Sequence, residues 1–217
     1  MGIIERILCK ICDSRKPRRY CPGVLGDICS ICCGTEREVT VRCPLECPHL
    51  QESRRHEQPP IADEAAFPNR DIRVTEAFLR ENEPILVFGA ATLLQAAMET
   101  EGAVDSDVRE ALDSLVRTYR TLESGLYYES RPTNPIAANI MTRMQDEVRK
   151  FREEMARNTG MHQVRDADFL GIFAFLQRLG IQHNNGRRLG RAFLDFLRTY
   201  FQPAGEQADD QPSLIVP

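Results

Sequence analysis

The residues with the clearest chemical potential are the eight cysteines, which all lie between Cys9 and Cys47 of the 217-residue chain. Two CxxC pairs each place two thiols on a tight turn, where both thiolates can reach one ion at the roughly 2.3 Å that tetrahedral zinc requires. These pairs predict one complete metal site, made of Cys9, Cys12, Cys29 and Cys32. We expect metal ligands rather than disulfides, because the chain has the features of a cytosolic protein and the cytosol is reducing.

Five further candidate ligands remain, one more than a second tetrahedral site needs. Adjacent Cys32 and Cys33 point to opposite sides of an extended backbone, so they are better placed to serve two ions than one. This favours an interleaved, cross-braced module in which the first and third ligand groups bind one Zn²⁺ and the second and fourth groups bind another. We predict that His49 is an alternate ligand or a supporting group, and that the second set is Cys21, Cys33, Cys43 and Cys47.

This segment also resembles a known family. The runs CKIC (9–12), YCP (20–22) and ICSIC (28–32) are similar to the opening of cross-braced zinc fingers of the HIT and MYND type. The likeness covers residues 9–49, and the chain departs from these fingers by lacking a cysteine a few residues after Cys21 and the usual terminal His-x3-Cys. The resemblance implies two zinc ions per chain and a role in protein interaction rather than catalysis.

Other uses of the cysteines stay open. Zinc alone can replace the core that so short a segment cannot build, since structural zinc supplies folding free energy on the order of 10 kcal/mol. An iron–sulfur cluster is an alternative, although the contiguous CxxCxxC signature is missing. Thiol redox catalysis is disfavoured, because no βαβ pattern surrounds the CxxC pairs.

A basic loop lies between the second and third cysteines and contains Arg15, Lys16, Arg18 and Arg19. It can meet phosphate or an acidic partner, or it can be a solvated loop. The charge balance gives nucleic acid little support: residues 1–58 hold ten Lys and Arg against eight Asp and Glu, and ligating thiolates would make this segment negative. The alternation from Glu38 to Arg42 predicts a short strand of a zinc hairpin.

Helical periodicity dominates the rest of the chain. Pro59 and Pro60 end a short polar exit helix, so we place the zinc module at residues 1–58, a linker at 59–70, a helical domain at 71–201 and a flexible acidic tail at 202–217. Asp105 or Ser106 is expected to cap the third of about six helices. The expected helices span 71–81, 84–101, 106–126, 135–155, 166–182 and 187–201. The predicted fold class is mainly α, with a small zinc module followed by an all-helical bundle.

No catalytic motif appears: the chain has no Gly-rich phosphate loop, no HExxH and no GxSxG. The most site-like polar segment is His183 to Arg188, where Arg187 and Arg188 precede a helix and would suit an anion, although an ordinary turn is the simpler interpretation. With 42% hydrophobic and 28% charged residues the composition fits a folded protein, and no apolar run is long enough to cross a bilayer.

We therefore expect a non-enzymatic cytoplasmic adaptor whose zinc module presents a surface to a protein partner. One alternative is a nucleic-acid-binding regulator that uses the basic loop with Arg187 and Arg188. The other is an enzyme with an unrecognised site in the helical domain. The sequence predicts no membrane partner and leaves the oligomeric state open.

Overall fold

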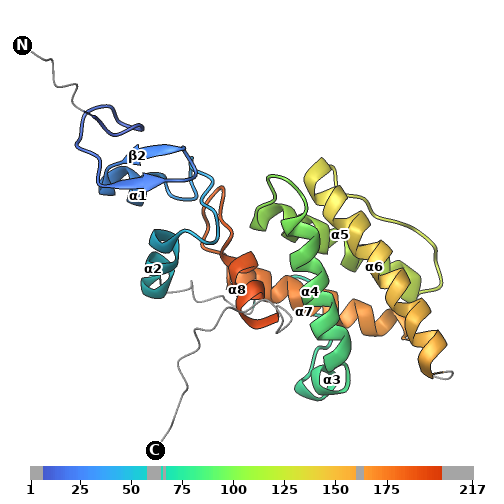
Figure 1. The fold of residues 1–217 in the computed structure, drawn as a ribbon. Helices are drawn as coiled ribbons and strands as arrows, with labels where there is room; N and C mark the ends of the chain where they lie inside the picture. The colour runs from blue at the N-terminus through green and yellow to red at the C-terminus, as the bar shows by residue number, and fades with distance from the viewer. Residues whose placement is uncertain (1–6, 58–64, 66, 160–163, 202–217) are drawn as a thin grey trace, which may run out of the picture.

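The computed structural model describes residues 7–57, 65, 67–159 and 164–201 of the chain. Within these ranges it contains eight helices and one two-stranded sheet, which confirms the prediction of a mainly helical fold. Figure 1 shows a small N-terminal module beside a larger helical domain. The predicted acidic tail and most of the predicted linker lie outside the described residues.

The module combines a hairpin with two short helices. Its elements are β1 (Arg19–Cys21), β2 (Gly26–Ile28), α1 (Ser30–Glu36) and α2 (Pro48–His56). The two strands pair antiparallel, with Arg19 opposite Ile28 and Cys21 opposite Gly26. The sulfur of Cys29 accepts a hydrogen bond from the Cys32 amide and so caps α1, while Pro48 occupies the first turn of α2, where its missing N–H costs nothing.

The strand predicted at Glu38 to Arg42 is wrong. The amides of Val39, Thr40 and Val41 all donate to the carbonyl oxygen of Glu36, so the chain turns directly after α1. Glu38 has a φ of 54°, a left-handed conformation that no strand contains. The alternating pattern is therefore explained by a tight turn, in which Val41 points into the small core of the module.

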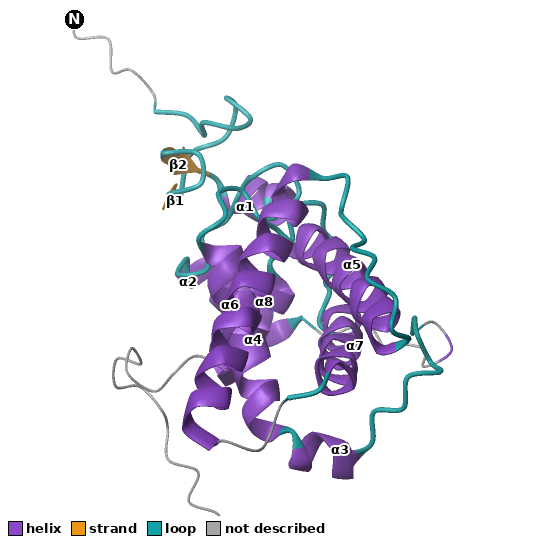
Figure 2. Ribbon diagram, turned by 90° about the vertical axis from the view of Figure 1, so that its right-hand side faces the viewer, coloured by secondary structure: helices purple, strands orange, loops and turns teal. Residues whose placement is uncertain are grey.

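The helical domain is built from α3 (Glu76–Glu81), α4 (Glu83–Met98), α5 (Asp105–Glu123), α6 (Pro135–Thr159), α7 (Asp166–Gln182) and α8 (Ala192–Phe201). The predicted central helix is α4, which buries residues around much of its circumference. Helix α4 packs on α6, α7 and α8, and α5 packs on α6 and α7, so that these five helices enclose one apolar core (Figure 2). Phe88 stacks on Phe151 at 4.2 Å between ring centres, and Tyr119 meets Phe173 edge-on at 5.0 Å.

Two helices begin later than predicted. Helix α3 begins at Glu76, because the Thr75 hydroxyl caps it and the Arg178 side chain holds the carbonyl oxygens of Asn69 and Ile72 in a loop. Helix α8 begins at Ala192 rather than Arg187, because the preceding backbone bonds to the module. Both differences arise from contacts between segments that are distant in sequence.

The predicted cap of α5 is also corrected. Val104 occupies the cap position, and the Asp107 carboxylate accepts a hydrogen bond from its amide. Asp105 instead turns toward α8, where its two carboxylate oxygens accept hydrogen bonds from the amides of Phe193 and Leu194 at 3.0 and 3.2 Å. A buried carboxylate therefore accepts hydrogen bonds from the free amides in the first turn of a helix that begins 87 residues later.

Candidate metal centre

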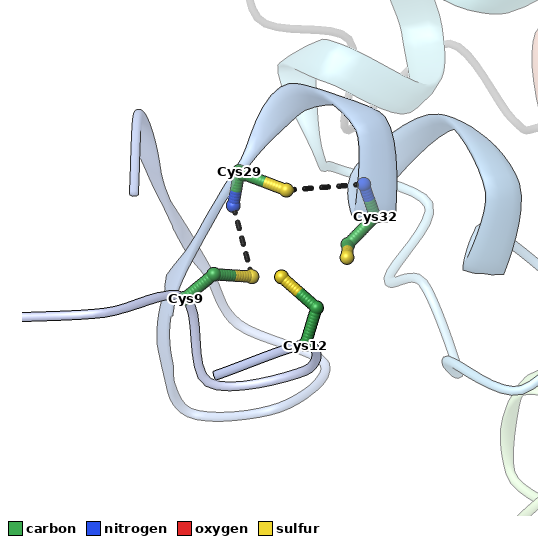
Figure 3. Close-up of side chains that lie close together, drawn as sticks. All are labelled: Cys9, Cys12, Cys29 and Cys32. Carbon is green, nitrogen blue, oxygen red and sulfur yellow. Dashed lines mark hydrogen bonds between the residues drawn. The ribbon is translucent and has the colours of Figure 1, made fainter. Parts of the chain in front are cut away.

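The four cysteines of the first predicted site come together (Figure 3). The sulfur atoms of Cys9, Cys12, Cys29 and Cys32 all lie within 4.8 Å of one another, close enough to share one ion. We call these four residues the distal group. The amide of Cys29 donates to the Cys9 sulfur at 3.2 Å, and the amide of Cys32 donates to the Cys29 sulfur at 3.4 Å. Backbone amides that point at sulfur stabilise thiolates, so this cluster fits a divalent cation.

Each pair of this group is held by a local turn. The amide of Cys9 donates to the carbonyl oxygen of Arg15 at 2.8 Å, and Asp13, with a φ of 46°, donates its amide to Cys9. The acceptor on Cys9 is its carbonyl oxygen, so residues 9–13 form a turn that brings Cys12 back beside Cys9. The second pair occupies the first turn of α1, so a helix terminus positions Cys29 and Cys32.

The thiols of the distal group differ in acidity. Hydrogen bonds from Ser14 lower the pKa of Cys12 to about 5, and the Cys32 amide lowers the pKa of Cys29. Burial raises the pKa of Cys32 to about 12. Arg15 bonds to the Cys29 sulfur, which raises the pKa of that guanidinium. The negative charge of a tetrathiolate site is therefore partly balanced by a residue of the basic loop.

The remaining candidate ligands line one small cavity of about 20 Å³. We call Cys21, Cys33, Cys43 and Cys47 the proximal group, with His49 beside it. Arg19 and Arg37 flank the cavity, and one guanidinium nitrogen of each lies 3.9 Å from the Cys33 sulfur. Within the described residues, the distal group alone has three or more ligand atoms within 4.8 Å of one another, so the proximal sulfurs would have to rotate inward to bind an ion.

Burial and neighbouring charges shift the pKa values of Cys43 and of His49 beside it. The pKa of Cys43 is raised first by burial and then by the charges of Glu38, Cys21 and Cys47. The pKa of His49 is lowered by burial and by the nearby arginines, which keeps its imidazole neutral. A neutral imidazole is the form that ligates zinc. The residues present therefore suit a second metal ion in kind, and they line one cavity, but their ligand atoms lie farther apart than those of the distal group.

The predicted basic residues have separate places in the structure. Arg15 and Arg19 contact the sulfurs of Cys29 and Cys33, and Arg15 is exposed together with Lys16 and Arg18. Arg187 donates to the carbonyl oxygen of Arg37 at 2.7 Å, and Arg188 donates to that of Val39 at 3.2 Å. The arginines that precede α8 thus join the helical domain to the module.

Sequence reasoning missed Glu38, which is fully buried between the module and the helical domain. Its carboxylate accepts hydrogen bonds from Arg54, Asn185 and the Arg191 amide at 2.7, 2.8 and 2.9 Å. Its carbonyl oxygen accepts a bond from the Leu189 amide at 2.7 Å. No local pattern identifies such a residue, because two of its partners, Asn185 and Arg191, lie about 150 positions away.

Sequence reasoning also missed the apolar surface of the module. Ile7, Tyr20, Leu25 and Ile31 are all more than half exposed. Leu25 has a φ of 51° in the hairpin turn, where glycine or asparagine fits with less strain. A large apolar side chain in an exposed turn is the sequence signal that would have identified this surface.

An open cleft of about 700 Å³ lies between α2 and α8. His183 stacks on Phe196 at 3.7 Å, and Tyr200 continues this aromatic wall. Two partly buried arginines of the cleft are paired, Arg54 with Asp195 and Arg187 with Glu57. The cleft therefore offers polar and aromatic walls.

In the described ranges, no helix combines the length and the apolar character that crossing a membrane requires. Comparison with known proteins finds no matching family model, no matching curated protein and no matching solved structure.

Proposed function

We propose that this chain is a non-enzymatic zinc-binding interaction protein, whose N-terminal module presents a surface to another protein. The tetrathiolate arrangement of the distal group supports zinc, because a closed set of four sulfurs leaves no open position for a substrate. The resemblance of residues 9–49 to HIT and MYND fingers supports a second zinc in the proximal group and an interaction role.

The observation that carries the proposal is the exposed apolar surface of the module. Within the described residues, six of the twelve exposed large hydrophobic side chains lie between residues 7 and 39, a small fraction of the chain. Burying them against a partner is favourable, at roughly 25 cal/mol per Å² of apolar surface removed from water. Lys16 and Arg18 lie exposed on the same module, so the surface suits an apolar segment that carries acidic residues.

A protein partner is favoured over nucleic acid by the arrangement of the arginines. Phosphate binding needs cations that are free to contact a backbone along a stripe. Arg15 and Arg19 contact sulfur, and Arg187 and Arg188 hold the module. Arg15 and Arg188 are exposed but make these contacts, so within the described residues Lys16 and Arg18 are the members of the predicted basic set whose side chains make no hydrogen bond or ion pair, too few for a groove that follows nucleic acid.

The metal part of the proposal is tested by native mass spectrometry and elemental analysis of the reduced full chain. We expect two zinc ions per chain. Iron with visible-range absorption would overturn the zinc assignment, and a single zinc would overturn the count.

The interaction part is tested by affinity capture with matched variants. Leu25→Asp with Ile31→Asp should abolish capture of a partner and leave the metal content unchanged. Tyr127→Asp changes a still more exposed large side chain in the helical domain and should have no effect. Capture that survives the module variant, or that is lost in the control, contradicts the proposed surface.

A further inference from the structure

We infer that the proximal group is a metal-dependent latch: an ion bound by Cys21, Cys33, Cys43 and Cys47 keeps the module docked on the helical domain, and its removal releases the module. This inference rests on the proposed second zinc ion and assigns it a role different from that of the distal ion. The distal group holds the apolar surface, whereas the proximal group holds the junction.

The first argument is the position of the proximal cysteines along the chain. Glu38 lies between Cys33 and Cys43, and Leu45 lies between Cys43 and Cys47. Glu38 is the centre of the hydrogen-bonded contact with the helical domain, and Leu45 is fully buried within the core of that domain. The proximal cysteines therefore bracket two of the segments that attach the module, and the third, α2, begins directly after Cys47.

The contact itself is extensive and directional. Three neighbouring residues of the turn bond to the loop between α7 and α8. The carbonyl oxygens of Arg37 and Val39 accept hydrogen bonds from Arg187 and Arg188 respectively. Glu38 accepts hydrogen bonds from Asn185, Leu189 and Arg191. Figure 1 shows this loop reaching from α8 to the module. Such a set of bonds requires one conformation of the turn, which has little secondary structure to maintain it.

A second set of contacts between the module and the helical domain involves the segment around Leu45. Arg198 donates to the carbonyl oxygen of Leu45 at 3.4 Å, and the Gln51 amide donates to the same oxygen at 2.6 Å. A Cβ added to Gly102 would lie 2.4 Å from an Arg42 guanidinium nitrogen, so Arg42 packs closely on the loop before α5. Cys43 separates Arg42 from Leu45 and is thus within two residues of both contacts.

The distal group has no comparable connection. Of the described residues, every hydrogen bond and ion pair between the module and the helical domain starts from residues 37–57 of the module. The distal cysteines lie at residues 9–32, and their backbone bonds stay within the hairpin and α1. Loss of the distal ion should therefore disorder the recognition surface and leave the junction in place.

Binding of the metal ion and docking of the module are thermodynamically linked. An ion that binds one conformation of residues 33–47 stabilises that conformation in proportion to its binding free energy. The turn is docked in that same conformation, so removing the ion raises the population of the undocked state.

Two backbone amides report docking directly. The amides of Leu189 and Arg191 donate to the backbone and to the side chain of Glu38 respectively, so they are protected from hydrogen exchange only when the module is docked. The experiment measures their exchange by NMR in the full chain, together with zinc content and with the exchange of α5 amides as an internal reference. It compares the wild type with Cys43→Ser and with the matched control Cys12→Ser.

We expect Cys43→Ser to retain one zinc and to accelerate exchange at both amides by at least about tenfold. We expect Cys12→Ser also to retain one zinc, with exchange at these amides within about twofold of wild type. Two zinc ions in Cys43→Ser would show that Cys43 does not hold the second ion, and would overturn the latch as stated. One zinc in Cys43→Ser with both amides still protected would leave the count intact and overturn the latch.

A second measurement keeps the inference testable if Cys43→Ser fails to fold. Chelator is added to Cys12→Ser, whose one remaining ion is expected in the proximal group, and exchange is followed during removal. Acceleration at Leu189 and Arg191 before any change in α5 supports the latch. Unchanged protection after complete removal of zinc, or exchange that accelerates throughout α5 at the same time, overturns it.

Discussion

The carboxylate of Glu38 accepts a hydrogen bond from the guanidinium of Arg54 at 2.7 Å, and solvent reaches 0% and 11% of the two side chains. Arg54 also pairs with Asp195 of α8 at 2.5 Å. One arginine of α2 thus links the turn after α1 to the last helix of the helical domain. Buried charges need every partner, because an unpaired ion in a low-dielectric site is costly.

Glu38→Ala should therefore destabilise the whole protein. It leaves Arg54 with one fewer buried partner and removes the acceptor of Asn185 and of the Arg191 amide. We expect a loss of about 3 to 5 kcal/mol in the free energy of unfolding, measured by urea denaturation at constant zinc. Glu52→Ala is the control: its carboxylate is exposed, so a change within about 0.5 kcal/mol is expected. Equal losses in the two variants would contradict the buried linkage.

Leu45 is the residue of the module that enters the core of the helical domain, where it is fully buried. Leu45→Ala should lower the free energy of unfolding by about 2 to 5 kcal/mol, through lost burial and the cavity that remains. The loss should appear in the circular dichroism of the helices as well as in the module. Leu25→Ala, at a side chain that is 73% exposed, should change stability by no more than about 0.5 kcal/mol. A loss confined to the module would show that the two parts unfold independently.

Asp105 should give the protein a pH-dependent stability. Burial raises its pKa from 3.8 in the unfolded chain to about 7 in the folded protein. The folded state thus binds the proton more tightly, so this contribution is complete below pH 3.8 and is lost as the pH rises through 7. The free energy of unfolding should fall by up to about 4 kcal/mol across this window.

Asp105→Asn should flatten this part of the profile, as measured by urea denaturation from pH 5 to pH 8. Protonation of zinc ligands at low pH affects the wild type and the variant equally, so the difference between the two profiles isolates Asp105. Identical slopes would contradict a raised pKa at this position.

The hairpin turn of the module packs directly on the turn after α1. A Cβ added to Gly23 would lie 2.6 Å from the Arg42 carbonyl oxygen and 2.7 Å from the Val41 side chain. Gly23→Ala should therefore lower stability by about 1 to 3 kcal/mol and weaken zinc retention against a chelator. Gly34→Ala is the matched control, because a Cβ there meets no atom within 4 Å inside α1. We expect the control to stabilise the helix by about 0.5 to 1 kcal/mol in thermal unfolding.

Local patterns were enough to predict much of this protein. The spacing of the CxxC pairs predicted the distal group, because two ligands on one tight turn need no information from elsewhere in the chain. The 3.6-residue periodicity predicted α4, α5, α6 and α7 close to their observed limits, because each buries one face or most of its surface in a common core.

The tertiary structure decided what depends on distant partners. Glu38 resembles a strand residue in its local sequence, yet its conformation is set by bonds to Asn185, Leu189 and Arg191. Arg187 resembles an exposed anion-binding residue, yet it holds the carbonyl oxygen of Arg37. Local periodicity reports which face of an element is apolar, whereas the partners of a buried charge are chosen by the packing of whole elements. That packing joins the cysteine-rich module and the helical bundle into one molecule.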